Sequence, residues 1–349
     1  MQERVLITGI LGQDGAYLAR HLLDLGHDVI GLGREFDDPA RLWRLRYLGV
    51  HDQVRLVELD LDTRGNDVLT RIAALRPDRI IHLAAQSSVA RSFAEPLLTA
   101  ESAGMGAVRI FEAARQLGGV PVVQPSSAEI LDLQGQTHID AHTPIGAQSP
   151  YGAAKAFAHL MARVYRQSMA TPISTAILFN HESPLRGDAF VTRKIVRELV
   201  RIRRELDAGV TQPAPLRLGK LDALRDWSHA RDIVQGLWLI AQHPQAGDHV
   251  LASGRLHSVR DFVSLTAAHV GLDMVWEGQG LDEVGRCPRD GHVWVSVDPA
   301  FYRPTDPDQM PVDLRSTIEA LHWQPTPSLA PLIAEMCDFE LTMNGRNAP

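Results

Sequence analysis

The chain has 349 residues, of which 45% are hydrophobic and 22% charged, as in an ordinary globular protein of about two domains. The net charge of −7 argues against a general binder of nucleic acids or anionic membranes, because no overall field attracts polyanions. Cys287 and Cys337 are the only cysteines, which excludes a disulfide framework and a four-cysteine zinc site. We find neither the apolar core of a signal peptide nor a run long enough for a membrane span, so we expect a cytoplasmic protein.

The first 180 residues alternate β-rich runs with segments of helical period, a pattern typical of parallel βαβ units. Arg4–Thr8 is the first expected strand, and the apolar spacing over 12–25 predicts a helix that ends before Gly26. Because the strand candidates are continuously apolar, we expect helices on both faces of their sheet. The further strands are expected at Asp28–Gly33, 55–59, 79–83, 120–123 and 172–179.

Beyond residue 180 the pattern changes to short helices, turns and proline-rich connections. Residues 211–215 and 277–290 are rich in Gly, Pro or Asp and are expected to form loops. We therefore predict a nucleotide-binding unit over residues 1–180 and a smaller α/β unit over residues 181–349, partly interleaved with the first.

A glycine-rich loop joins the first expected strand to the first expected helix. Gly9, Gly12 and Gly15 are spaced so that the backbone can turn tightly, approach a pyrophosphate and direct the helix N-terminus at it. Strand, glycines and helix follow one another at the start of the chain, which strengthens the interpretation. The loop, with Gln13 and Asp14, predicts a dinucleotide site in a Rossmann-type doubly wound parallel sheet.

The end of the second expected strand bears on the choice of dinucleotide. Gly33 stands where an NAD enzyme of this architecture usually has an acid, and Arg34 beside it can pair with a 2′-phosphate, so NADP is favoured. Glu35 keeps NAD open, since a shift of one residue would place its carboxylate at the acidic position. Asp60, followed by Leu61, can reach the adenine or can be a solvated turn acid.

Tyr151 and Lys155 lie four residues apart at the start of an expected helix, so their side chains share one face. An ammonium stabilises a phenolate, and we expect Lys155 to lower the pKa of Tyr151 so that it can take a proton from a sugar hydroxyl. Ser127 and Glu129 follow the fifth expected strand, at the sheet edge where ligands bind. Ser127 can bond a substrate hydroxyl and Glu129 can act as a base, although a helix cap and a surface acid are alternatives.

Segments along nearly the whole chain resemble the GDP-mannose 4,6-dehydratase family of extended short-chain dehydrogenases/reductases. The sequences Asn-His-Glu-Ser-Pro at 180–184 and Thr-Arg-Lys at 192–194 distinguish this family from other sugar-nucleotide dehydratases and epimerases. The resemblance is carried by residues 7–15, 83–87, the pair Tyr151 and Lys155, and residues 177–184, 190–194, 224–227 and 301–304.

The resemblance implies dehydration of GDP-D-mannose to GDP-4-keto-6-deoxy-D-mannose. C4 is oxidised transiently, C5 is deprotonated, water leaves from C6 and the hydride returns from NADPH. In these steps Tyr151 takes the C4 hydroxyl proton, Glu129 the C5 proton, Ser127 polarises the sugar hydroxyl and Lys155 holds the nicotinamide ribose. The implied cofactor residues are Gly9, Gly12, Gln13, Asp14, Gly15, Arg34, Asp60, Leu61, Leu83, Ala84, Ala85, Gln86, Ser87, Lys155, His181 and Arg186. The implied substrate residues are Ser87, Asn180, Lys194, Arg225 and Arg303.

Several positions depart from the family pattern. After Glu129, Leu131 and Asp132 replace a tyrosine and a glycine of the family. Leu98 replaces a tyrosine that touches the cofactor in the family, Glu35 replaces a second arginine, and Asp306 replaces a glutamate. These changes indicate a divergent member, and they leave a 4,6-dehydratase for another GDP-hexose open.

Other functions remain as alternatives, namely a related sugar-nucleotide epimerase or dehydrogenase and a non-catalytic NADP-binding regulator. The family also implies a homodimer or homotetramer that works in deoxysugar biosynthesis, in a GDP-fucose or GDP-rhamnose pathway. No histidine pair has metal-ligand spacing, so no metal is predicted, and His181 and His229 are interpreted as hydrogen-bonding residues. No role is predicted for residues 278–292.

Overall fold

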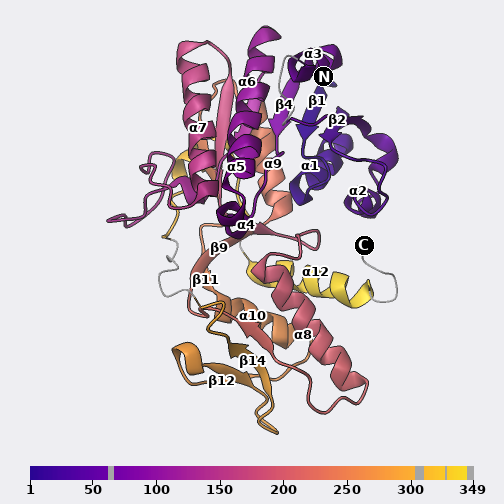
Figure 1. Ribbon diagram of the computed structural model, residues 1–349, viewed down its shortest axis with the longest axis vertical. Helices are drawn as coiled ribbons and strands as arrows, with labels where there is room; N and C mark the ends of the chain where they lie inside the picture. Colours follow the sequence, from indigo (N-terminus) through magenta and orange to yellow (C-terminus); the bar gives the residue numbers. More distant parts are fainter. Residues whose placement is uncertain (62–66, 303–309, 327, 344–349) are drawn as a thin grey trace.

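The computed structural model describes residues 1–61, 67–302, 310–326 and 328–343 (Figure 1). Its central sheet has seven parallel strands in the order β10-β6-β5-β4-β1-β2-β3. This order confirms the doubly wound parallel sheet. The strands are β1 (Arg4–Thr8), β2 (Asp28–Gly33), β3 (Arg55–Glu58), β4 (Arg79–His82), β5 (Val122–Pro125), β6 (Ile173–Leu178) and β10 (Asp248–Leu251).

The six strands predicted before residue 180 are present, and the largest shift is at β5. That strand was expected over 120–123 but runs from Val122 to Pro125. Gln124 and Pro125 pair with Thr175 and Ala176 of β6 and are buried, so the strand continues past the end of the apolar run. The apolar pattern did not predict this strand end because Gln124, although buried, is polar.

Helices cover both faces of the sheet, as the apolar strands predict (Figure 1). Val5 and Ile7 pack in one core with α1 (Gln13–Asp24) and α9 (Ala230–Gln242). Leu6 points to the other face, toward α3 (Asp67–Leu75), α6 (Gly106–Gln116) and α7 (Pro150–Ser168). Shorter elements connect them: α2 (Trp43–Tyr47), the turn η1 (His51–Gln53), α4 (Val89–Ala94), α5 (Pro96–Thr99), the π-helical turn η2 (Ala100–Met105) and the turn η3 (Ala128–Ile130).

The second unit lies below the sheet in Figure 1 and has its own core between helices and two small sheets. Its helices are α8 (Val191–Asp207), α10 (Val259–His269) and α12 (Leu329–Thr342). One sheet has the order β12 (Val275–Glu277), β13 (Val284–Arg286), β14 (Val293–Val297) and β8 (Leu216–Leu218), and the turn η4 (Gly280–Asp282) precedes β13. The other has the order β11 (Leu256–Ser258), β9 (Leu224–His229) and β7 (Asn180–Glu182).

The loop expected over 277–290 is wrong in part, because β13 lies within it. Gly285 in this strand leaves room for the side chain of Met274, whose sulfur would lie 2.5 Å from a Cβ at that position. The glycine that suggested a loop therefore serves packing in a strand. Residues 211–215 contain neither helix nor strand, as expected.

The chain returns to the first sheet after residue 180. β10 pairs with β6, α9 packs on α1, and Trp323, which follows α11 (Arg315–Leu321), lies in the same core. Partial interleaving of the two units was expected, while a boundary at residue 180 stays a prediction. Among the described helices, none combines the length and the apolar character that a membrane crossing requires.

Candidate active site

The glycine loop between β1 and α1 lies against the end of β4. Gly9 has a φ of +70°, and a Cβ on it would lie 2.8 Å from the backbone nitrogen of Ala84. A Cβ on Gly15 would lie 2.5 Å from the carbonyl oxygen of Gly9, so the helix can approach the loop only because this residue is glycine. The close packing explains two of the three glycines.

The N-terminus of α1 is open for an anion. Gly12 is the N-cap of this 12-residue helix and has no side chain with which to occupy the first backbone N–H groups. Such a terminus attracts phosphate oxygens through its N–H groups and its dipole. The loop and helix therefore have the shape and chemistry that a dinucleotide pyrophosphate needs.

Arg34 and Glu35 follow β2 beside this loop. A Cβ on Gly33 would lie 2.9 Å from the ring of Phe36, so the phenyl ring occupies the space beside this glycine. Glu35 has a left-handed φ of 58°, and its carboxylate pairs with Arg41 at 2.7 Å. Glu35, the residue that left NAD as an alternative cofactor, thus forms an ion pair with Arg41.

Tyr151 and Lys155 lie in the first two turns of α7. Ser149 caps the helix by accepting a 3.0 Å bond from the Gly152 N–H, and Pro150 fills its first position, so the helix starts just before the tyrosine. Both side chains are buried, and the ammonium of Lys155 donates a 3.0 Å bond to the carbonyl of Pro125 at the end of β5. The pair is thereby attached to the carboxyl edge of the sheet.

Ser127 and Glu129 come from the turn η3, which packs on the start of α7. The Ser127 hydroxyl accepts a 3.2 Å bond from the Glu129 N–H and also bonds the Tyr151 phenol. A Cβ on Gly152 would overlap the Glu129 carbonyl oxygen, so the close approach of turn and helix depends on this glycine. The structure thus brings Ser127, Glu129 and Tyr151 together.

The pKa of Tyr151 corrects one expectation. This pKa is raised to about 12, chiefly by burial; the bond with Ser127 lowers it, and the charge of Glu129 adds to the rise. Burial also lowers the pKa of Lys155 to about 8. Our expectation that Lys155 lowers the pKa of Tyr151 was wrong for this structure, because its ammonium is directed at the Pro125 carbonyl and burial outweighs the groups that favour phenolate.

His181 and Arg186 lie in the segment that runs from β7 toward α8. One ring nitrogen of His181 lies 3.0 Å from the Asp14 carboxylate, which places the histidine at the glycine loop. Arg186 pairs with Glu182 at 3.1 Å and stacks on the Phe190 ring. His181 therefore lies at the glycine loop, and a role of either residue in cofactor binding stays a prediction.

The expected substrate residues lie where the sheet meets the second unit. Asn180 in β7 pairs with Trp227 of β9, and Arg225 belongs to the same strand β9. Lys194 in α8 donates a 2.7 Å bond to the carbonyl of Arg217 and lies over the Phe301 ring, and burial lowers its pKa. Arg303 and Asp306 lie outside the described residues.

Comparison with known proteins places the chain in a family. Residues 6–336 match the family model described as GDP-mannose 4,6 dehydratase. The chain belongs to the GDP-mannose 4,6-dehydratase family. It is 37% identical to a GDP-mannose 4,6 dehydratase of Homo sapiens, over 98% of this chain and 93% of the relative. It is also 37% identical to a GDP-mannose 4,6-dehydratase of Vibrio cholerae, over 100% of this chain and 96% of the relative.

Solved structures share the fold of this dehydratase-family chain at lower identity. A dTDP-glucose 4,6-dehydratase of Streptomyces venezuelae with NAD bound has a TM-score of 0.78 at 22% identity, over 98% of each chain. The RMD protein of Pseudomonas aeruginosa, solved with NADPH, has a TM-score of 0.70 at 19% identity, over 97% of this chain and 99% of that one. The resemblance inferred from the motifs is confirmed.

Two further cofactor-side features of this dehydratase-family chain were not predicted. Arg44 in α2 donates to the carbonyl oxygens of Leu185 and Leu11, at 2.8 and 3.2 Å, and so ties the glycine loop to the segment before α8. Thr8 bonds His82 at 2.7 Å and accepts a 3.0 Å bond from the Ala84 N–H. Arg44 stands in no motif that the sequence analysis identified, and the motif over residues 7–15 does not predict the partners of Thr8, so only the folded chain shows these contacts.

The remaining predicted residues lie along the same edge. Residues 83–87 run from β4 to α4, Ser87 is exposed, and the Gln86 amide bonds the Thr99 hydroxyl at 3.1 Å. Asp60 is exposed after β3, and Leu61 is buried with its carbonyl bonded by Arg109. These residues thus follow the carboxyl ends of β3 and β4, and their contact with a cofactor stays a prediction.

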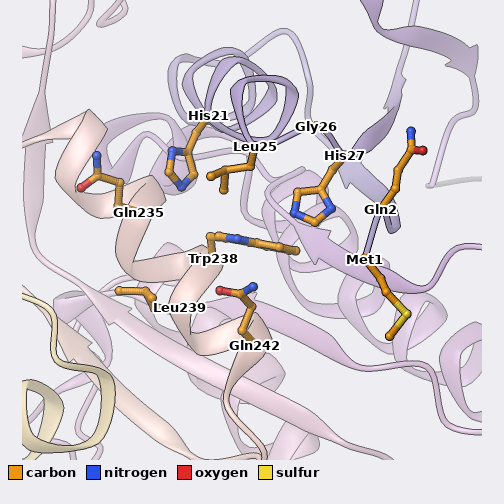
Figure 2. A pocket seen from close by; sticks show the side chains of 10 residues that line it. All are labelled: Met1, Gln2, His21, Leu25, Gly26, His27, Gln235, Trp238, Leu239 and Gln242. Atoms are coloured by element: carbon orange, nitrogen blue, oxygen red, sulfur yellow. The ribbon is translucent and has the colours of Figure 1, made fainter.

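Two hollows lie apart from the predicted site residues. Figure 2 shows one of about 680 Å³ between α1 and α9, with His21 and His27 above the Trp238 ring. The other, of about 450 Å³, is lined by Tyr302 together with Gly278, Gln279 and Glu283. Part of the segment 278–292, for which no role was predicted, therefore lines a hollow together with Tyr302.

Proposed function

We propose that this chain dehydrates GDP-D-mannose to GDP-4-keto-6-deoxy-D-mannose, with NADP as its cofactor. The observation that carries the proposal is the meeting of Tyr151, Ser127 and Glu129 where η3 packs on α7, with Lys155 anchored at the end of β5. This set contains a proton acceptor for a sugar hydroxyl and a second base for a carbon acid. Family membership supplies the substrate and the reaction class.

A nicotinamide dinucleotide would supply a hydride acceptor for C4 and a hydride donor for C6, so the reaction would need no net reductant. The chain would hold this group with the open N-terminus of α1, the glycine loop and Lys155. His181 and Arg186 would complete the site from the segment after β7.

Tyr151 removes the proton of the C4 hydroxyl in the first step. With a pKa of about 12 its phenol holds its proton at neutral pH, so proton transfer depends on the groups that stabilise phenolate. Ser127 is one such group, because its hydroxyl bonds the phenol. The same hydroxyl can turn to the sugar and orient the C4 oxygen.

Glu129 performs the second proton transfer. Its side chain is exposed at the edge of η3, where a sugar can reach it. A ketone at C4 makes the C5 proton acidic, and the carboxylate takes it. The carboxylic acid can then give a proton to the C6 hydroxyl, which leaves as water.

The preference for NADP is supported by Arg34. Its guanidinium follows β2 and suits a 2′-phosphate, and Gly33 supplies no acid at the position that NAD favours. The pairing of Glu35 with Arg41 removes the nearest competing carboxylate.

The nucleotide diphosphate would be bound by Lys194, Arg225 and Arg303, with Asn180 beside them. Ammonium and guanidinium groups suit such a dianion. The product, a keto-deoxysugar nucleotide, would enter deoxysugar biosynthesis, in a GDP-fucose or GDP-rhamnose pathway. Both cysteines are buried free thiols, as a reducing cytoplasm permits.

The chain would act as a homo-oligomer, a dimer or a tetramer that contains that dimer. Phe157, Leu160 and Val164 are exposed along one face of α7, and Leu97 and Met105 are exposed on the adjoining α5 and η2 (Figure 1). An apolar face of this kind is typical of an interface, and a second copy would bury it by two-fold symmetry.

One experiment tests the reaction directly. The purified protein is incubated with GDP-mannose, related GDP-hexoses and dTDP-glucose, and each product is weighed by mass spectrometry. Loss of one water from GDP-mannose without accumulation of NADPH is expected, and Glu129→Gln should abolish it while NADP binding persists. Net NADPH formation or an unchanged product mass would favour the dehydrogenase or epimerase alternatives.

A further inference from the structure

A continuous chain of hydrogen bonds joins the start of α1 to the segment after β6. The Ser183 hydroxyl donates to the Gln13 amide oxygen at 2.6 Å. The Gln13 amide nitrogen donates to one carboxylate oxygen of Asp14 at 3.1 Å and to the carbonyl of His181 at 3.2 Å. The other Asp14 oxygen lies 3.0 Å from Nε2 of His181, which closes the chain.

The two partners of His181 define its protonation state. Nδ1 lies 2.8 Å from the carbonyl oxygen of Phe179, and Nε2 faces the Asp14 carboxylate. A carbonyl and a carboxylate only accept hydrogen bonds, so both ring nitrogens must donate, and the ring is an imidazolium. The Asp14 side chain is 23% exposed and that of His181 11% exposed, so the two charges interact with limited screening by water.

The pKa directions agree with this geometry. Burial would raise the pKa of Asp14, but the charge and hydrogen bond of His181, with Arg186, lower it to about 2. Burial would lower the pKa of His181, but Asp14 raises it above the ordinary value. Both directions favour the charged form of each partner, as the geometry does.

Asp14 also acts on the catalytic groups. Its charge raises the pKa of Lys155 and of Tyr151, and it raises that of Arg44. The ionisable groups around the pair come from three elements and one loop. They are Lys155 and Tyr151 of α7, Arg44 of α2, Glu129 of η3, which acts on Tyr151, and Arg186 before α8.

We propose that Asp14 is a positioning residue: its ion pair with His181 docks the strand Asn180–Glu182 onto the cofactor loop. This inference rests on the proposed function and adds a residue that acts on the reacting groups through others. This ion pair sets the distance between the glycine loop and the segment from β7 to α8. The negative charge of Asp14 also opposes the lowering of the Lys155 pKa by burial.

The first test uses the cofactor-free protein and requires no activity. Asp14 stabilises the fold above its unfolded pKa, and that stability is lost as pH falls through about 2. His181 stabilises it below its unfolded pKa, and that part is lost as pH rises through the folded pKa. The melting temperature of Asp14→Asn should therefore fall further below wild type at pH 5.5 than at pH 9, and Asp24→Asn, on the same helix with an exposed carboxylate, should show no such difference.

The second test is the pH dependence of kcat/KM with NADP and GDP-mannose. Removal of the Asp14 charge lowers the pKa of Tyr151 and of Lys155, so both limbs of the profile should move about one pH unit to lower pH. NADP should bind about tenfold more weakly by calorimetric titration, because the docked strand is released. Asp14→Glu keeps the charge and should restore the limbs without restoring the affinity.

If Asp14 had a merely structural role, Asp14→Asn would be less active and less stable. The limbs of its kcat/KM profile would not move, and its melting temperature would differ from wild type by the same amount at every pH. That result in Asp14→Asn would overturn the inference, as would limbs that move equally in Asp24→Asn. If wild type has no dehydratase activity, the proposed function fails, while the melting curves of the cofactor-free protein still decide on the Asp14–His181 pair.

Discussion

Gly152 determines how closely the base-bearing turn approaches the catalytic helix. A Cβ at this position would overlap the carbonyl oxygen of Glu129 and lie 3.2 Å from both the Cβ of Ala147 and the hydroxyl of Ser149. Ordinary contact begins at 3.4 Å, so Gly152→Ala forces η3 or the first turn of α7 to retreat by about 1 Å. The substitution therefore changes the distance between Glu129 and Tyr151 without altering either side chain.

A displacement of about 1 Å at reacting groups costs on the order of a hundredfold in rate. We expect Gly152→Ala to lower kcat by about that factor, with KM for NADP changed less than threefold, because the cofactor loop lies elsewhere. The free energy of unfolding should fall by about 1 to 3 kcal/mol, the usual range for overpacking. Steady-state kinetics and urea unfolding measure the two effects.

Gly106→Ala is the matched control. Its Cβ would lie 3.6 Å from the nearest atom, the carbonyl oxygen of Glu101, which is ordinary contact, and the residue begins α6. This variant should keep wild-type kcat and stability. A Gly152→Ala enzyme with wild-type kcat would refute the reasoning that the approach of η3 to α7 sets the catalytic geometry.

Three shorter predictions concern the phenol, the cofactor and the interface. Ser127→Ala removes a group that lowers the pKa of Tyr151, so the ascending limb of kcat/KM against pH should move to higher pH and the rate should fall about tenfold. Ser127→Thr keeps the hydroxyl and should leave the limb in place. An unmoved limb in the alanine variant would contradict this role of Ser127. Arg34→Ala should weaken NADP binding about tenfold in a fluorescence titration and leave NAD binding unchanged, and equal losses would argue against a 2′-phosphate contact. Leu160→Glu should convert the oligomer to a smaller species in light scattering, and an unchanged mass would exclude this face of α7 as the interface.

The parts of the fold predicted from sequence depend on local rules. Arg4–Thr8 and Asp28–Gly33 are continuous apolar runs that end at glycine or at the glycine loop, and both were predicted with the observed ends. The spacing of Gly9, Gly12 and Gly15 reports steric needs within one turn, which the structure confirms at Gly9 and Gly15. Such features need no knowledge of distant residues.

The parts that were missed depend on tertiary contacts. β13 contains Gly285, whose lack of a side chain is explained only by Met274 packing on it from outside the strand. The ends of β5 depend on pairing with β6, about 50 residues further along the chain. The spacing of apolar residues within one segment contains no information on the packing of Met274 or on the pairing of β5 with β6.

The candidate site shows the same division. The motif places Tyr151 and Lys155 on one helix face, and the helix has them there. The pKa of Tyr151, however, depends on the burial that the whole site creates and on Ser127 and Glu129 from another segment. The bond of Lys155 to Pro125 and the pairing of Asp14 with His181 join residues about 30 and 170 positions apart, so neither could be derived from spacing.

The fate of one hydrogen atom tests the proposed reaction most directly. GDP-mannose carrying deuterium at C4 is incubated with the enzyme and catalytic NADP, and the product is examined by NMR and mass spectrometry. We predict that the deuterium appears at C6 of a product lighter by one water, because the hydride removed from C4 returns within the same site. Deuterium retained at C4, found in solvent or accumulated in NADPH would contradict the proposed function.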